Sequence, residues 1–267
     1  MFRKLTFLIL VVPFCLCAGC AVNPITGEEE FMLLPQQQDI EIGRKYAPEV
    51  EKQMGGRIHD EHLQSYIDSV GQKIAKISHR PDLEYHFVAL DHNSVNALAL
   101  PGGYVFITKG MLQKLTTEAQ LAGILGHEIS HVVARDSAVV MSREIGISIL
   151  LSAVISEKTP EGVATAANLT RQILGLKYSR KDEREADLAG LDYMYRAGYN
   201  PYGIVETMQM LDKQQEQRPV EFFSTHPNPE NRVAYLTQSV QAEYYNVEEL
   251  KIGEEDYRKA VLERLSN

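Results

Sequence analysis

The chain has 267 residues, enough for one sizeable domain with short appendages, and its hydrophobic content of 44% and charged content of 24% are ordinary for a globular protein. The formal net charge is −9 and no lysine or arginine block is long enough to follow a phosphate backbone, so we expect no nucleic-acid partner. The three cysteines, Cys15, Cys17 and Cys20, all lie at the very start of the chain, which leaves the fold dependent on its apolar core even in an oxidising compartment.

The N-terminus has the pattern of a secretory signal peptide. A basic start, Arg3-Lys4, precedes the apolar run LTFLILVVPFCLC, and small residues follow it. The run is too short to span a bilayer comfortably. Its end, LCAGC, resembles a bacterial lipobox, in which Cys20 is lipidated and becomes the mature N-terminus. The alternative is cleavage nearby with an incidental cysteine, because Leu16 lies one place earlier than in the usual pattern.

These features divide the chain into three expected segments. Residues 1–19 form a lipoprotein signal peptide. Residues 20–35, rich in proline, glycine and glutamate, form a lipidated tether that leads away from the membrane. Residues 36–267 form a single domain, since the sequence has no internal repeat and the tail after about Val240 is too short for a second one.

The first half of the domain predicts two helices and then a small sheet. Apolar residues recur at helical spacing from Gln36 to about Gln53 and from Asp60 to about Ser78. The sheet follows as three strands around a Pro-Gly-Gly turn, at residues 83–91, 94–100 and 104–108.

From Thr116 onward nearly everything is expected to be helical. Thr117 is a plausible cap for the helix that begins there. Residues 145–156 are apolar all round but too few to cross a membrane, so they predict a core helix or a lid. Residues 179–198 predict a long helix that ends at Gly198.

The motif that carries chemistry is His127-Glu128-Ile129-Ser130-His131, which has the form H-E-x-x-H. Residues four apart on a helix share a face, so His127 and His131 can bind one Zn²⁺ while Glu128 takes a proton from a water beside it. The alternative is a helix that merely tolerates two histidines. That alternative is weak, because the surrounding residues predict a buried helix, and buried histidines without a shared purpose are costly.

A catalytic zinc site needs a third protein ligand, which the helix at 179–198 can supply. Glu183 and Asp187 lie one turn apart, so we assign Glu183 as ligand and Asp187 as the partner that holds His127 by its far nitrogen. Glu185 faces elsewhere and is the fallback ligand. The acidic run on its own would be read as a solvated charged face.

Four stretches together, NALALPGG, H-E-x-x-H, SRKDEREAD and STHPNPENR, resemble metallopeptidase family forty-eight, a gluzincin family. The resemblance covers roughly residues 24–240 and is closest to the small periplasmic lipoprotein members, since the transmembrane helices of the membrane-embedded members are missing. It implies an α+β, predominantly helical zincin domain over residues 36–267, with one Zn²⁺ and a small mixed β-sheet whose edge strand lines the active-site cleft. Glu183 and Asp187 fit the family's third-ligand motif.

The resemblance also gives roles to two further stretches. Asn96, Ala97 and Leu98 match the edge strand with which an extended substrate would pair, although an ordinary sheet strand would have the same sequence. His226 lies in a loop near the cleft. It can donate to the oxyanion of the reaction, occupy the fourth position of the zinc and hold the enzyme off, or simply help to cap the helix that follows Pro229.

We therefore expect a zinc metalloendopeptidase in which His127, His131 and Glu183 hold the metal and Glu128 is the general base. We expect it to be lipid-anchored at Cys20 on the periplasmic side of a Gram-negative envelope, with the outer membrane favoured. Its substrates would be extended, unfolded or misassembled envelope proteins, and its partners would include envelope assembly machinery. The alternative is a zinc-bound, latched or non-proteolytic chaperone-like lipoprotein.

Overall fold

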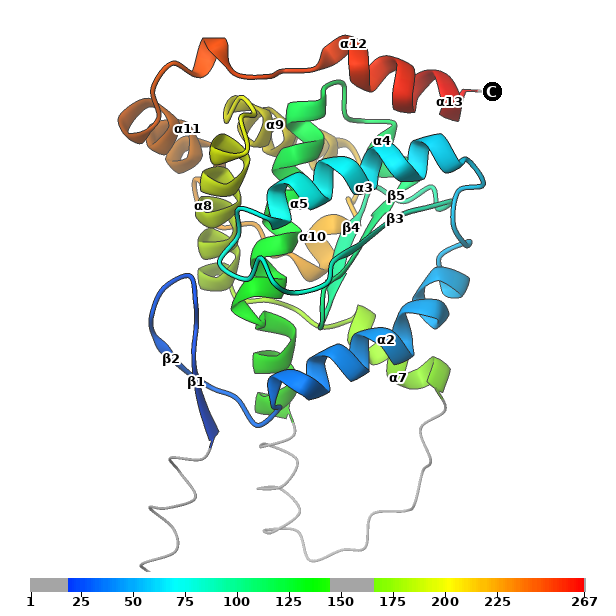
Figure 1. Cartoon of the computed structure of the whole chain (residues 1–267), viewed down its shortest axis with the longest axis vertical. Helices are drawn as coiled ribbons and strands as arrows, with labels where there is room; N and C mark the ends of the chain where they lie inside the picture. The colour runs from blue at the N-terminus through cyan, green and yellow to red at the C-terminus, as the bar shows by residue number, and fades with distance from the viewer. Residues whose placement is uncertain (1–18, 145–165, 267) are drawn as a thin grey trace, which may run out of the picture.

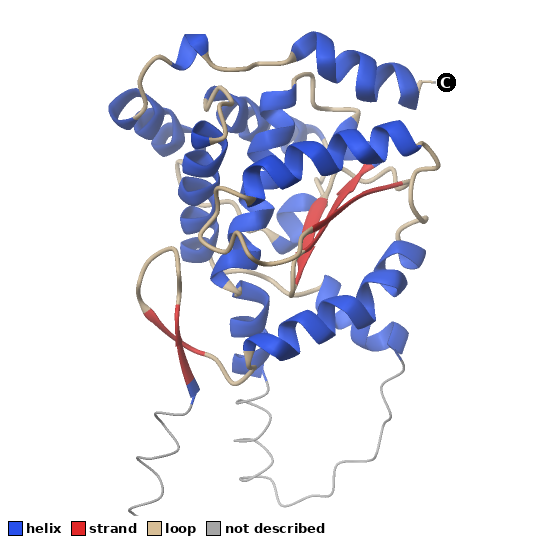
Figure 2. Cartoon of the chain, viewed as in Figure 1, coloured by secondary structure: helices blue, strands red, loops and turns tan. Residues whose placement is uncertain are grey.

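Helices make up most of the molecule and surround one small mixed sheet (Figures 1 and 2). A computed structural model of the chain describes residues 19–144 and 166–266. The strands are β1 (Cys20–Val22), β2 (Glu29–Phe31), β3 (His86–Leu90), β4 (Ala97–Leu100) and β5 (Tyr104–Thr108). The α-helices include α2 (Gln36–Gln53), α3 (Glu61–Ala75), α4 (Lys109–Leu112), α5 (Glu118–Ala134), α7 (Ala166–Leu174), α8 (Arg180–Arg196), α9 (Tyr202–Gln217), α10 (Phe222–Thr225), α11 (Arg232–Glu243) and α12 (Glu254–Tyr257). Three short helical segments complete the chain: η2 (Val247–Glu249), the π-helical η3 (Arg258–Leu262) and α13 (Glu263–Leu265).

The main sheet has the order β3-β5-β4, in which β3 is parallel and β4 antiparallel to β5. β4 therefore lies at one end of the strand order. β4 begins three residues later than the sequence predicts, because the Thr108 hydroxyl, in place of a neighbouring strand, binds backbone groups of the residues before it. That hydroxyl donates to the carbonyls of Ser94 and Asn96, at 2.7 and 2.8 Å, and accepts from the N–H of Asn96.

Apolar helix faces cover both sides of this sheet. On one side α3, α5, α8 and α9 share the main core with sheet residues such as Phe87 and Ile107. On the other side α2 and the end of α7 pack against Val88, Leu90 and Phe106. The sheet is thus buried on both faces, which explains its nearly continuous apolar sequence.

Part of the predicted tether, residues 20–35, forms regular secondary structure. β1 and β2 form an antiparallel hairpin that stands beside the body at one end of the molecule (Figure 1). The residues that follow it are tied down, because Met32 is buried against Ala138 and Val139. Apolar residues in and next to the hairpin, Ala21 and Leu34, pack against the same cluster. The lipidation of Cys20 remains a prediction, and the structure places that residue, exposed, at the start of β1.

The predicted apolar segment at 145–156, and most of the lid expected between the helices that carry the ligands, lie outside the described residues. None of the helices in the described part of the chain combines the length and apolar character that a membrane crossing requires.

The C-terminal residues pack into the main core, which α3, α5, α8 and α9 form with the sheet. Tyr257 and Val261 are fully buried in it, and Lys251 pairs with the buried Glu118 at the start of α5, at 2.8 Å. The segment that follows α11, which we call the C-terminal arm, crosses the end of the molecule opposite the β1–β2 hairpin (Figure 1).

Candidate metal centre

Two long helices, α5 and α8, bring the predicted residues together. Each begins where the sequence supplies a cap: the Thr117 hydroxyl accepts from the backbone of α5, and Ser179 and Asp182 form a capping box at α8. The helices approach very closely at Gly126 and Gly190, where a Cβ atom built on Gly190 would lie 2.7 Å from the backbone nitrogen of His127. Only glycine allows this contact without displacing a helix.

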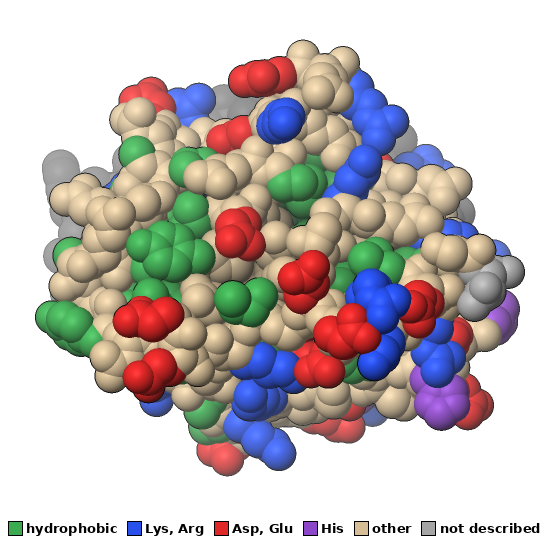
Figure 3. All heavy atoms as spheres, turned by 90° about the horizontal axis from the view of Figure 1, so that it is seen from above, with side chains coloured by type: hydrophobic (Ala, Val, Ile, Leu, Met, Phe, Trp, Pro, Cys, Tyr) green, Lys and Arg blue, Asp and Glu red, His purple; other side chains and the backbone are tan. Residues whose placement is uncertain are grey.

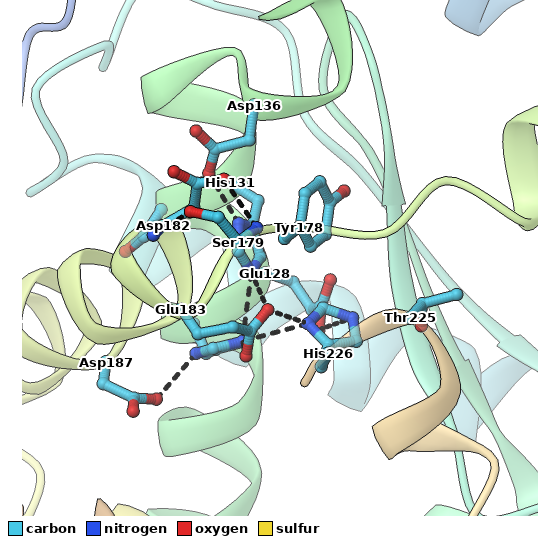
Figure 4. A network of polar contacts seen from close by, with 12 residues as sticks. Glu128, His131, Asp136, Tyr178, Ser179, Asp182, Glu183, Asp187, Thr225 and His226 are labelled. Atoms are coloured by element: carbon cyan, nitrogen blue, oxygen red, sulfur yellow. Dashed lines mark hydrogen bonds and ion pairs between the residues drawn. The ribbon is translucent and has the colours of Figure 1, made fainter. Parts of the chain in front are cut away.

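The close approach places four donor side chains in one cluster (Figure 4). His127, His131, Glu183 and His226 each offer a ligand atom, and these atoms all lie within 4.8 Å of one another. The Nε2 atoms of His127 and His131 are 3.1 Å apart, and Glu183 lies 3.5 and 3.4 Å from them. Donor atoms that share one ion tetrahedrally, with bonds of about 2.0–2.2 Å, are separated by about 3.3–3.6 Å. The residues therefore fit a divalent transition metal.

The buried carboxylates of the site are a second, independent indication of a metal cation. The site buries four carboxylates, those of Glu128, Asp136, Glu183 and Asp187, beside Arg232, the one arginine that is buried in the described part of the chain. Both oxygens of Glu128 and one oxygen of Glu183 have no hydrogen-bond partner. Buried unpaired carboxylate oxygens are expensive, so the arrangement calls for a cation.

Asp187 lies behind His127, where the sequence analysis expected it. Its Oδ1 is 2.9 Å from Nδ1 of His127 and accepts from Nη2 of Arg232 at 2.5 Å, while the Tyr235 hydroxyl donates to its other oxygen. Burial alone would raise the pKa of Asp187, but the Arg232 charge and the contact with His127 outweigh it and lower the pKa. Asp187 is thus an ionised acceptor that holds His127 in one tautomer.

Asp136 performs the same task for His131, and sequence reasoning missed it. Its Oδ2 lies 2.6 Å from Nδ1 of His131. α5 ends at Arg135, whose backbone is left-handed at φ 63°, and this turn brings Asp136 back toward the ring. Burial lowers the pKa of His131, but the bonds to Asp136 and Glu183 outweigh it and raise the pKa to about 10. The sequence does show an aspartate, Asp136, directly after the end of the helix, and this position could have indicated a partner for His131.

Tyr178 is a second residue that the sequence analysis did not assign. Its ring stacks on His131, with centroids 4.0 Å apart and an interplanar angle of 16°, and its hydroxyl lies 3.0 Å from the Ser137 hydroxyl. Together with Asp136 it fixes the orientation of His131 (Figure 4).

His226 lies inside the cluster and not at the start of a helix. Its Nδ1 is 2.8 Å from Glu183 and 3.3 Å from Nε2 of His127. α11 begins only at Arg232 and has no side-chain cap, so the helix-capping alternative is wrong. Burial lowers the pKa of His226 and favours the neutral ring, which is the form that can bind a metal.

The carboxyl of Glu183 is ionised in this setting. Burial alone would raise its pKa, but electrostatic interaction with the His226 ring and the hydrogen bonds with His127 and His131 hold the pKa well below its usual range. Glu185, the fallback ligand, lies outside the cluster and pairs with Lys181 at 3.4 Å.

A cleft of about 210 Å³ opens beside the cluster. It is lined by Asn96 and by Leu98, Ala99 and Leu100 of β4, by the end of α7, and by His226. Asn96 is 5% exposed and its Oδ1 has no partner, while its Nδ2 donates to Glu221 at 3.4 Å. Ala97, the middle residue of the predicted edge strand, is fully buried and does not line the cleft.

Comparison with known proteins agrees with this geometry. The profile of peptidase family M48 matches residues 61–240. The chain is similar to the beta-barrel assembly-enhancing protease of Escherichia coli, at 28% identity over 227 residues, which cover 79% of this chain and 45% of that protein. It is also similar to the mitochondrial metalloendopeptidase OMA1 of Arabidopsis thaliana, at 29% identity over 68% of this chain and 37% of that protein, and of Schizosaccharomyces pombe, at 28% identity over 80% and 65%. The chain therefore spans about half the length of the curated relatives it matches.

Proposed function

Since the chain belongs to peptidase family M48, we propose that it is a zinc-dependent endopeptidase of the cell envelope. The observation that carries the proposal is the convergence of His127, His131 and Glu183 beside Glu128, whose two buried oxygens have no partner. A purely structural metal site has no use for such a base.

His127, His131 and Glu183 would hold one Zn²⁺ in this centre. When bound, the ion supplies Lewis acidity that polarises the scissile carbonyl and acidifies a water molecule. Glu128 accepts the proton of that water and passes it to the leaving amine. Asp187 and Asp136 keep the two imidazoles in the tautomers that direct Nε2 toward the ion.

The substrate would lie along β4, the outer strand of the sheet, as one more strand. Asn96 lines the cleft and its buried Oδ1 has no hydrogen-bond partner, which supports a role for this oxygen as acceptor of a substrate N–H. Strand addition recognises the backbone and requires an extended chain. Unfolded or misassembled envelope proteins meet that requirement, with Asn96, Ala97 and Leu98 as the pairing residues.

The proposed location rests on the sequence of the N-terminus. The signal-like start and the lipobox-like Cys20 support a lipid anchor on the periplasmic side of a Gram-negative envelope, with the outer membrane favoured. A relative named for β-barrel assembly supports envelope assembly machinery as a partner.

The position of His226 favours a second form of this function, in which the resting centre is latched. A histidine nitrogen 2.8 Å from Glu183 and 3.3 Å from His127 is placed to occupy a fourth metal position. Its other nitrogen lies 3.7 Å from Glu128, where it can instead donate to the oxyanion during the reaction. A chain latched permanently would be a zinc-bound, chaperone-like lipoprotein.

One experiment separates these forms. Zinc content and cleavage of unfolded casein are measured for wild type, Glu128→Gln and His226→Ala, with the exposed His62→Ala as control. Loss of cleavage in Glu128→Gln with zinc retained establishes the hydrolase. A gain in His226→Ala identifies a latch and a loss identifies an oxyanion donor, whereas zinc in all four proteins and cleavage in none rejects the peptidase.

A further inference from the structure

Exposed apolar side chains gather on the β1–β2 hairpin. In the described part of the chain five large hydrophobic side chains are exposed, and three of them lie here: Val22 at 61%, Phe31 at 43% and Leu33 at 40%. The other two, Tyr245 and Ile252, belong to the C-terminal arm at the opposite end of the molecule. Scattered exposed hydrophobics are normal, but three within one hairpin form a patch.

The pairing register places these side chains on one face. Cys20 pairs directly with Phe31 and Val22 with Glu29, so the side chains of Cys20, Val22 and Phe31 share one face of the hairpin, with the exposed Glu29 at its edge beside Val22. Leu33 follows Phe31 by two residues, just beyond the end of β2. Phe31 and Leu33 both contact the backbone at Gly19, where a Cβ atom would lie 3.3 and 3.4 Å from them. We refer to Val22, Phe31 and Leu33 as the hairpin patch.

The opposite side of the hairpin segment is fixed to the body. Met32 packs against Ala138 and Val139, and the backbone N–H of Leu33 donates to the Ser142 hydroxyl at 2.9 Å. Arg135 donates to the carbonyl of Leu34 at 2.6 Å. The hairpin patch is therefore held in one orientation relative to α5 and the metal centre.

We propose that the hairpin patch is a membrane-contact surface that inserts into the acyl boundary of a phospholipid bilayer. The occupant is indicated by what precedes the hairpin, since the apolar run of residues 5–17 ends immediately before Gly19. A lipid carried by the Cys20 side chain would join the chain on the same face as Phe31. The proposal rests on the envelope location proposed above.

The negative charge of the protein disfavours attraction to anionic lipids, so the hairpin patch would contact the membrane through its apolar side chains. The chain carries a net charge of −9. Glu28 precedes β2 and pairs with Lys181 of α8, while Glu29 and Glu30 are the first two residues of β2. The opposite end of the molecule presents interspersed acidic and basic side chains (Figure 3). Apolar anchoring at one end therefore fixes the direction in which the cleft faces relative to the membrane.

The chain has no tryptophan, so a single introduced indole reports on this surface. Phe31→Trp and, as matched control, Tyr245→Trp are made in the full chain and purified from cell membranes with the native N-terminus. Each is reconstituted into phosphatidylcholine vesicles with plain or brominated acyl chains. We expect brominated lipid to quench Phe31→Trp about twofold or more and Tyr245→Trp hardly at all, because only the former reaches the acyl boundary. Leu33→Trp provides a second reporter if Phe31→Trp misfolds.

Equal, weak quenching of all reporters in chains that float with the vesicles overturns the proposal while leaving the anchor intact. Chains that do not float overturn both the contact and the envelope anchor, whereas casein cleavage by the same preparations tests the peptidase separately. A blue-shifted, unquenched Phe31→Trp with doubled mass in detergent identifies a second copy of the chain as the occupant and also overturns the proposal.

Discussion

Replacing Asp136 should loosen the metal without unfolding the protein. Asp136 is 4% exposed and its Oδ2 lies 2.6 Å from Nδ1 of His131, so it orients this proposed metal ligand without being a ligand itself. Loss of such a partner typically weakens metal binding about 10- to 100-fold, or about 1.4–2.7 kcal/mol. Asp136→Asn keeps the shape and a neutral acceptor, so we expect about 10-fold. Asp136→Ala removes both, so we expect about 100-fold.

The assay is the rate at which zinc passes from the loaded protein to a chromogenic chelator. The release rate reports on the bound state, whereas the equilibrium constant also contains the proton that the metal-free His131 takes up at its pKa of about 10. Asp192→Asn, which alters an exposed pair with Arg196 on α8, serves as control and should release zinc like wild type. Wild-type release by Asp136→Asn and Asp136→Ala alike would refute the reasoning.

Three further predictions follow from single contacts. Glu128→Gln should keep its zinc and lose about 10²–10⁴-fold in casein cleavage, because only the base is removed; zinc lost along with activity would contradict that role. Gly190→Ala should cost about 1–3 kcal/mol by overpacking against His127, which lowers Tm by about 2–12 °C. Gly175→Ala, whose Cβ would lie 3.3 Å from its nearest neighbour, is the control, and equal Tm values for both variants would show that the helices separate freely. Asp60 caps α3 and its pKa is lowered, chiefly by the backbone hydrogen bond, so its stabilisation is present above the ordinary pKa of 3.8 and is lost as the pH falls further. Asp60→Asn should therefore show a flatter loss of Tm below pH 4, and an unchanged slope would count against this linkage.

The local sequence pattern was sufficient to predict features that lie within a single helix. The helical period and the Thr117 cap predicted α5, and H-E-x-x-H on that helix predicted that His127 and His131 share one face. The one-turn spacing of Glu183 and Asp187 predicted that one carboxylate stands behind the other. Each of these inferences depends only on the geometry of a regular helix.

Local pattern failed where the backbone leaves regular geometry. Residues 20–35 have the composition of a linker, yet they pair as a hairpin because Met32 finds an apolar contact more than a hundred residues away. Asp136 reaches His131 only because Arg135 adopts a left-handed conformation. Neither contact leaves a periodic signal in the sequence.

By itself, then, the sequence determined the kinds of groups in this protein: two histidines and a base on one helix, two acids on another, and an apolar N-terminal run. The tertiary structure alone decided which of them meet. The distances between His127, Glu183 and His226 depend on how closely α5 and α8 pack at Gly126 and Gly190 and on where α10 ends. Those are properties of helix packing, set by side-chain volume across elements far apart in the chain, and no spacing along the sequence encodes them.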